Sequence, residues 1–276
     1  MVDETLAVVR QQLATEARKF RIGQYGWCEP DYRQIIIWAK ALSLEPEEVI
    51  HRLLEGKMKG IGKWGDAEWN EWAKTVFADG KLLRLNWNFD LLPIQSFEWV
   101  DGLAITHLAF SSSLSSRRVP MLSLRLPSLT HLLCNRLGLR ELDLSSMPKL
   151  KCLNLGWEHL TTLDISSVPQ LKYLNCGETQ ITKLDLSNVP ILMWLGLEAN
   201  HLTELDLSNV PMLKALHCVQ NLLTELDLSK VPMLTELFCF GNNLVELDIR
   251  FLEHLKNLGY DKGKTRLIQR PDQHFE

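Results

Sequence analysis

The sequence predicts a solenoid of stacked repeats, with parallel strands along one side and α-helices at its N-terminus. Two markers indicate the repeat. A Leu-Asp pair returns every 21 residues, and its aspartates are Asp143, Asp164, Asp185, Asp206, Asp227 and Asp248. A proline keeps the same step from Pro127 to Pro232. The first 80 residues have neither marker and show helical periodicity instead, so two kinds of structure are expected.

Residues 1–80 are expected to form a helical cap domain. Apolar residues recur at helical spacing over 6–20 and again over 32–42, where Asp31 is expected to cap the helix. Further helices are expected at 46–56 and at 66–80, each closed by a glycine. Seven of the nine tryptophans precede residue 100, which favours large aromatic side chains packing the cap onto the first repeat. A separate recognition domain is the alternative.

One unit, residues 213–232, shows how each repeat is expected to fold. Its first half reads L-x-x-L-x-C-x-x-N-x-L, and its second half reads L-x-x-L-D-L-S-x-V-P. Strand alternation turns Leu216 and Cys218 inward, while Leu226 and Leu228 point inward from the return segment. The apolar area buried by one unit does not offset the entropy of ordering it, so neighbouring units must stabilise each other.

This pattern resembles the leucine-rich-repeat family, and its second half resembles a bacterial 21-residue alternating subtype. The resemblance implies a right-handed solenoid of the α/β class, with a parallel concave sheet and short extended or 3-10 convex segments. The solenoid is assigned to residues 81–261, regular from about 129, and a C-terminal cap with a frayed tail to 262–276. The family's asparagine is present at Asn200, Asn221 and Asn242, but early repeats have Leu137, Glu158 and Thr179 there.

Composition narrows the function classes. The net charge of −4 lacks the basic excess typical of nucleic-acid binders. No apolar run is long enough to span a membrane, and the N-terminus lacks a secretory pattern. Six cysteines are too few for a disulfide scaffold in 276 residues. We therefore expect a cytoplasmic protein with neither nucleic acid nor membrane as its partner.

No catalytic residue, cofactor or metal is expected. The G-x-G-x-x-G motif at 60–65 follows an expected helix rather than a strand, so it indicates a basic hinge.

Cysteines sharing one inward strand position are interpreted as small buried apolar groups rather than metal ligands; these are Cys134, Cys176, Cys218 and Cys239. Cys28 and Cys152 are the thiols to test for reactivity, and Cys152 is expected on the concave surface. The repeated aspartates are expected to accept hydrogen bonds from turn amides or nearby serines, rather than to bind calcium.

The family frame places large side chains on the concave face. The candidate binding residues are Trp157, Tyr173, Glu178, Trp194, Glu198, His217, Phe238 and Phe240. Exposed rings of this kind are typical interface anchors, the glutamates favour a partner with basic residues, and glycines beside the rings are expected to leave room. We expect a non-catalytic scaffold that binds a protein partner. The alternatives are rings packed as a structural ridge, a bacterial effector acting in another cell, and an enzyme or ligand-binding function in the N-terminal helices.

Overall fold

The structure is a computed structural model, and it describes residues 21–22, 25–26, 29–55, 75–78, 81–88, 104–111, 121–273 and 275. The chain divides into two compact units. The first comprises Met1–Ser113 and Leu124–His131, and the second comprises Leu114–Ser123 and Leu132–Glu276. Each unit is described by itself.

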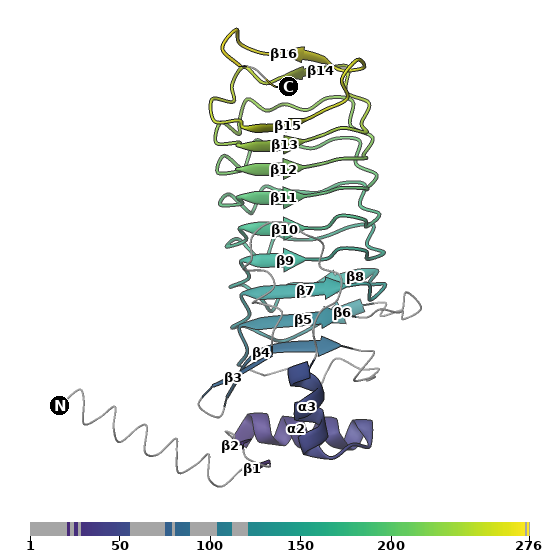
Figure 1. The fold of residues 1–276 in the computed structure, drawn as a ribbon, viewed down its shortest axis with the longest axis vertical. Helices are drawn as coiled ribbons and strands as arrows, with labels where there is room; N and C mark the ends of the chain where they lie inside the picture. Colours follow the sequence, from purple (N-terminus) through teal and green to yellow (C-terminus); the bar gives the residue numbers. More distant parts are fainter. Residues whose placement is uncertain are drawn as a thin grey trace, which may run out of the picture. The chain divides into compact units, whose positions relative to one another are not determined.

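In the part of the first unit that is described, helices α2 and α3 accompany a small set of strands (Figure 1). Helix α2 spans Glu29–Leu42 and α3 spans Pro46–Glu55, and their apolar faces bury Ile35, Trp38, Ala39, Val49, Ile50 and Leu53. The strands are β1 (Arg21–Ile22), β2 (Tyr25–Gly26), β3 (Val76–Ala78), β4 (Lys81–Asn88) and β5 (His107–Ser111). Strand β4 pairs antiparallel with β3 and parallel with β5, while β1 and β2 form an antiparallel pair.

The two central helix predictions are confirmed, with two corrections. Helix α2 begins at Glu29, so Asp31 lies inside its first turn and is not its cap. The carboxylate of Asp31 instead accepts a hydrogen bond from the Leu82 amide at 2.6 Å, which joins α2 to β4. A helix reaching residue 80 is wrong over Val76–Ala78, because pairing with β4 holds this segment as a strand. The helix expected at 6–20 and the glycine motif at 60–65 lie outside the described residues.

The second unit is a parallel-sheet β-solenoid, as predicted (Figure 1). Its main-sheet strands are β7 (His131–Asn135), β9 (Cys152–Asn154), β10 (Tyr173–Asn175), β11 (Trp194–Gly196), β12 (Ala215–His217), β13 (Glu236–Phe238) and β15 (Asn257–Gly259), stacked in this order. From β9 to β15 each residue pairs with the one 21 positions later, such as Tyr173 with Trp194. On the return side β6 (Met121–Ser123) pairs with β8 (Glu141–Asp143), and β14 (Glu246–Asp248) with β16 (Arg266–Ile268).

The repeat leucines fill the core of the solenoid, as the alternation predicts. Leu216, Cys218, Leu226 and Leu228 are all buried. Asn221 accepts a hydrogen bond from the Leu202 amide at 3.0 Å and donates to three backbone carbonyls, so consecutive turns are joined by buried polar contacts. These bonds leave the turn amides paired where water does not reach them.

The C-terminal segment, where the sequence predicts a cap followed by a tail, is described through residue 273. Strand β16 adds to β14, and the side-chain amide of Gln273 donates to the carbonyls of Ile249 and Leu252 at 3.0 Å each. Gln273 is therefore tied to backbone groups that the last repeat leaves open. Within the described residues, no helix has the length and apolar character needed to cross a membrane.

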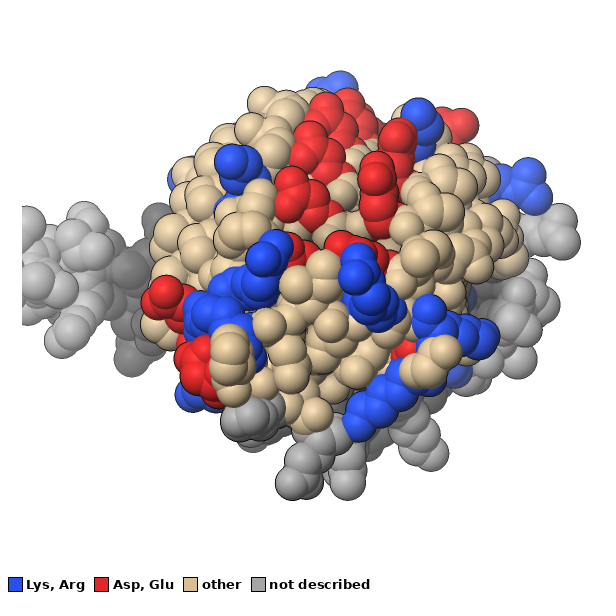
Figure 2. Space-filling model, turned by 90° about the horizontal axis from the view of Figure 1, so that it is seen from above, with Lys and Arg blue, Asp and Glu red and all other residues tan. Residues whose placement is uncertain are grey.

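The return side of the solenoid is acidic, and part of its charge is ion-paired. Glutamates and aspartates of successive repeats line a groove of about 650 Å³, and Figure 2 shows acidic side chains gathered in one sector of the surface seen from above. Lys183 pairs with Glu204 at 3.0 Å, Arg250 with Asp248, and Arg266 with Glu246. This side therefore has the character of a solvated, ion-paired surface.

Candidate functional site

Five side chains form one cluster on the outer face of the main sheet, the face identified as concave by the family frame. We call Trp194, Glu198, His217, Glu236 and Phe238 the His217 cluster. Strand β11 supplies Trp194, β12 supplies His217, and β13 supplies Glu236 and Phe238. Glu198 lies two residues after β11. Parallel in-register pairing sets these strands side by side, so residues distant in sequence meet on adjacent strands.

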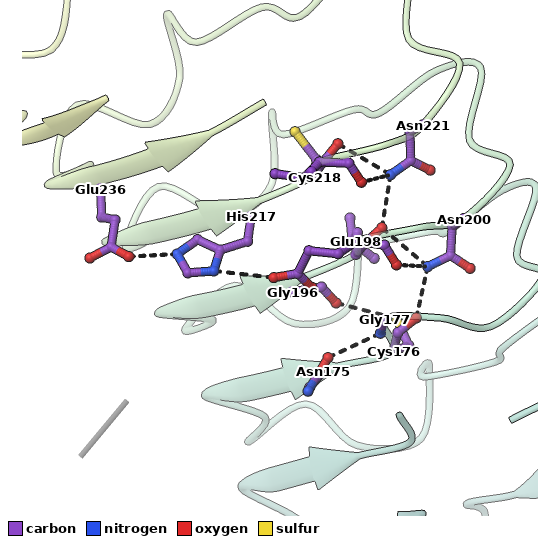
Figure 3. Close-up of polar contacts among 12 residues, drawn as sticks. Asn175, Cys176, Gly177, Gly196, Glu198, Asn200, His217, Cys218, Asn221 and Glu236 are labelled. Atoms are coloured by element: carbon purple, nitrogen blue, oxygen red, sulfur yellow. Dashed lines mark hydrogen bonds and ion pairs between the residues drawn. The ribbon is translucent and has the colours of Figure 1, made fainter. Parts of the chain in front are cut away.

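His217 is the centre of the cluster and is only 6% exposed. Its Nε2 lies 2.6 Å from Oε1 of Glu236, and its Nδ1 lies 3.2 Å from Oε1 of Glu198 (Figure 3). Burial lowers the pKa of His217, but hydrogen bonds to the two carboxylates and their charges outweigh it and raise that pKa above 6.5. The arrangement therefore favours a protonated ring between two carboxylates.

Two aromatic rings pack on His217 edge to face. The Trp194 ring centroid lies 5.3 Å from that of His217 at 67°, and the Phe238 centroid lies 4.9 Å away at 68°. Trp194 and Phe238 are half-buried, so each ring still presents one part to solvent. Such geometry suits the quadrupoles of the rings and fixes their orientation.

The glycines next to these rings do not provide open space, which corrects the prediction. A Cβ added at Gly196 would lie 2.4 Å from Cη2 of Trp194, and one at Gly259 would lie 2.6 Å from Cδ1 of Phe238. The space that a side chain would occupy at Gly196 or Gly259 is thus filled by the ring of Trp194 or Phe238. The absence of a Cβ allows Trp194 and Phe238 to lie flat along the sheet, and partner atoms do not fit at these two positions.

Trp157 and Glu178 lie apart from the cluster. Both follow a strand in a turn and adopt positive φ, 62° and 53°. The same backbone conformation recurs every 21 residues, at Arg136, Trp157, Glu178, Ala199, Gln220 and Gly241. The guanidinium of Arg136 lies 4.8 Å from the Trp157 ring centroid, and these residues line a cavity of about 290 Å³ with Glu178. Trp157 and Glu178 therefore belong to the edge of the sheet.

The remaining candidates flank the cluster. Tyr173 is half-buried on β10, in register with Trp194, and Phe240 is 44% exposed two residues after β13. Of the eight candidates, Trp194, Glu198, His217 and Phe238 meet in one cluster, and Tyr173 and Phe240 extend the same face. Glu236 also faces outward, as alternation predicts, and its contact with His217 is the shortest in the cluster.

Glu158 stands at the repeat position that is asparagine in the later repeats. The sequence indicates a gap in the asparagine ladder here, but Glu158 fills the same structural role. Its carboxylate accepts hydrogen bonds from the Leu137 amide at 3.0 Å and the Leu139 amide at 2.7 Å. Leu139 precedes it by 19 residues, as Leu202 precedes Asn221, so Glu158 takes the acceptor role of the asparagine. Burial raises the pKa of Glu158 to about 7, against the opposing effect of these backbone hydrogen bonds.

The cysteine and aspartate interpretations can be compared with the structure. Cys134, Cys176, Cys218 and Cys239 are buried, as predicted, and burial raises the pKa of each thiol. Cys152 lies in register with Tyr173 on the outer face of the sheet, as expected, but its side chain is buried. The side chain of Cys28 lies outside the described residues.

Five of the repeated aspartates accept hydrogen bonds from the amides of serines two residues later, at 2.8 to 2.9 Å. These bonds match the predicted role of the aspartates in the turns. In the portion of the chain that is described, no group of three or more His, Cys, Asp or Glu residues could hold a metal ion.

Comparison with known proteins supports the fold. No family model matches the sequence, and no curated protein sequence matches it. Among solved structures, the functional domain of InlJ from Listeria monocytogenes, described as including a cysteine ladder, is 30% identical, with a TM-score of 0.50. That match covers 59% of this chain and 40% of the InlJ chain.

One further structure with a TM-score above 0.5 agrees with this fold. A chain of the LRIM1/APL1C complex is 20% identical, with a TM-score of 0.52, over 64% of this chain and 38% of its own. A leucine-rich-repeat protein of Leptospira interrogans is 19% identical, with a TM-score of 0.43, over 62% and 57%. The matched region spans less than half of the first two relatives. The chain folds as a parallel-sheet solenoid like those of leucine-rich-repeat proteins.

Proposed function

We propose that this chain is a non-catalytic scaffold that binds a protein partner on the outer face of its parallel sheet. The binding residues are the His217 cluster together with Tyr173 and Phe240. One observation carries the proposal: half-exposed aromatic rings are held in fixed orientations beside two carboxylates on a rigid sheet. Rings that are already ordered lose little entropy on binding, and they are typical anchors of interfaces.

The charge of the cluster favours a partner with basic residues. Two carboxylates surround one imidazolium, so the cluster keeps a net negative charge. An arginine or lysine of the partner could approach Glu198 or Glu236 while its apolar neighbours contact Phe240. The overall charge of −4 is the basis for proposing a protein rather than a nucleic acid. A cytoplasmic location and a bacterial origin remain part of the proposal, as expected from the repeat pattern.

Capture from a lysate of the source organism tests the proposal. The double variant Phe238→Ala, Phe240→Ala removes two rings of the face and is expected to lose the partner that the wild-type chain retains. The matched control is Met212→Ala, because Met212 is 45% exposed, close to the 44% of Phe240, but precedes β12 instead of lying on the sheet face. Circular dichroism confirms that each variant is folded.

Two results would contradict the proposal. Full retention of the partner by the double variant would assign these rings to a structural ridge. Loss of the partner with Met212→Ala alone would move the binding surface to the edge where Ile191, Met212 and Met233 are exposed in successive repeats.

A further inference from the structure

Each ring nitrogen of His217 lies within hydrogen-bond distance of a carboxylate, and this arrangement determines which protonation state of the ring fits. Glu198 reaches its Nδ1 from the turn after β11, and Glu236 reaches its Nε2 from β13. A neutral imidazole has one N–H and one lone pair, so it can donate to only one carboxylate. The second nitrogen would then direct its lone pair at a negatively charged oxygen. Both contacts are favourable together only when the ring is doubly protonated.

Among the described residues, the segments beside β12 bring no positively charged group to this ring. The turn after β11 presents Glu198 to the ring and β13 presents Glu236, while Trp194 of β11 and Phe238 of β13 add uncharged rings. Oε2 of Glu236 lies 3.5 Å from Nδ2 of Asn257, a neutral donor. Because His217 is nearly buried, its interaction with the two carboxylates is weakly screened by water.

We propose that His217 is a proton-operated clasp on the outer face of the sheet, which holds Glu198 and Glu236 when protonated and releases Glu198 when it loses a proton. The Nδ1–H bond breaks, the proton passes to water, and the ring becomes neutral. The Nε2 contact with Glu236 is kept, since it is the shorter of the two, at 2.6 Å against 3.2 Å. The net charge of the three groups changes from −1 to −2.

The clasp would regulate the function proposed above. Release of Glu198 leaves a carboxylate unpaired beside Trp194, so a partner with arginine or lysine should bind more tightly at a pH above the His217 transition. Only this consequence rests on the proposed function. The protonation behaviour of His217 is a property of the isolated chain and can be measured without a partner.

NMR titration of the full chain, labelled with ¹³C and ¹⁵N in histidine, tests the clasp between pH 5 and 9. The ring signals of His217 are expected to report two N–H groups at low pH and to titrate above 6.5. Glu198→Gln should lower the midpoint by about one pH unit, since it replaces a charged acceptor with a neutral one. The Trp194 indole N–H signal should follow the same midpoint in the wild-type chain, because its ring packs on His217.

The control is His254→Gln, which removes an exposed histidine and should leave the His217 midpoint unchanged. A wild-type midpoint at or below 6.5, or an equal midpoint in Glu198→Gln, would overturn the clasp. Glu198 lies outside the strands, so the decisive variant does not alter sheet pairing.

Partner retention distinguishes the two proposals. Under the clasp, the wild-type chain retains its captured partner more strongly at pH 8 than at pH 6, and Glu198→Gln loses most of this difference. If His217 titrates as expected but the double phenylalanine variant still binds its partner, the clasp stands and the binding face is wrong. If capture depends on the phenylalanines while His217 titrates at or below 6.5, the binding face stands and the clasp is wrong.

Discussion

Replacing Glu158 with glutamine should make the stability of the solenoid less dependent on pH. In the folded chain Glu158 is buried, and its pKa is raised from 4.5 to about 7. This rise corresponds to about 3 kcal/mol, at about 1.4 kcal/mol for each tenfold change in proton affinity. Since the folded pKa is the higher one, the stabilising contribution of Glu158 is fully present below pH 4.5 and is lost as the pH rises through 7.

Glu158 accepts from the Leu137 and Leu139 amides with separate oxygens, so glutamine keeps an acceptor for only one of them and turns its NH2 group toward the other, which costs a pH-independent amount of stability. Glutamine carries no charge at any of these pH values. The difference in unfolding free energy between Glu158→Gln and wild type should therefore change with pH by up to about 3 kcal/mol between pH 4.5 and 8.5, in the direction that favours the variant at the higher pH. Urea denaturation followed by circular dichroism from pH 4.5 to 8.5 measures it. Glu225→Gln, at an exposed carboxylate, is the control and should show almost no difference. A constant difference between Glu158→Gln and wild type would refute this reasoning.

Three further predictions concern the same solenoid. Asn221→Ala removes hydrogen bonds to the Leu202 amide and to three carbonyls, so urea denaturation should show a loss of about 2–4 kcal/mol, whereas the exposed Asn209→Ala should change stability by less than about 0.5 kcal/mol. An equal effect of both variants would contradict the role of the asparagine ladder. Gly196→Ala should displace the Trp194 ring and shift its indole N–H signal, while Gly156→Ala, whose added Cβ would lie 3.4 Å from the nearest atom, should not. The four ladder cysteines should resist thiol-specific labelling until urea unfolds the chain, as peptide mapping by mass spectrometry can show; labelling of Cys218 in the native chain would disprove its burial.

The repeat itself could be predicted because each marker residue has one structural role. Leucines and cysteines at alternating positions are core residues, and each aspartate that follows a leucine pairs with a turn amide. Two segments that form strands, Val76–Ala78 and β16, contain no such marker residue. Val76–Ala78 is a strand because β4 provides a pairing partner, and β16 is ordered because β14 does. Both depend on contacts between segments distant in sequence, which local periodicity does not encode.

The candidate site was predictable as a face but not as a cluster. Alternation identifies Trp194, His217 and Phe238 as outward residues of neighbouring strands. It does not reveal that His217 bridges two glutamates, because this depends on side-chain conformations across three strands. Trp157 was misplaced for a different reason. The turn after each strand has positive φ at residues as different as Arg136, Trp157 and Ala199. Gly241 alone among these positions is a residue type that favours positive φ, so the turn has no sequence signature.

The most direct test of the binding face is hydroxyl-radical footprinting of the chain with and without its captured partner. Side-chain oxidation is read residue by residue, so the two exposed apolar surfaces can be compared in one experiment. The account predicts that the partner protects Trp194, Phe238 and Phe240, whereas Met212 and Met233 are oxidised equally in both samples. Protection of Met212 and Met233 with unchanged oxidation of the three rings would contradict it.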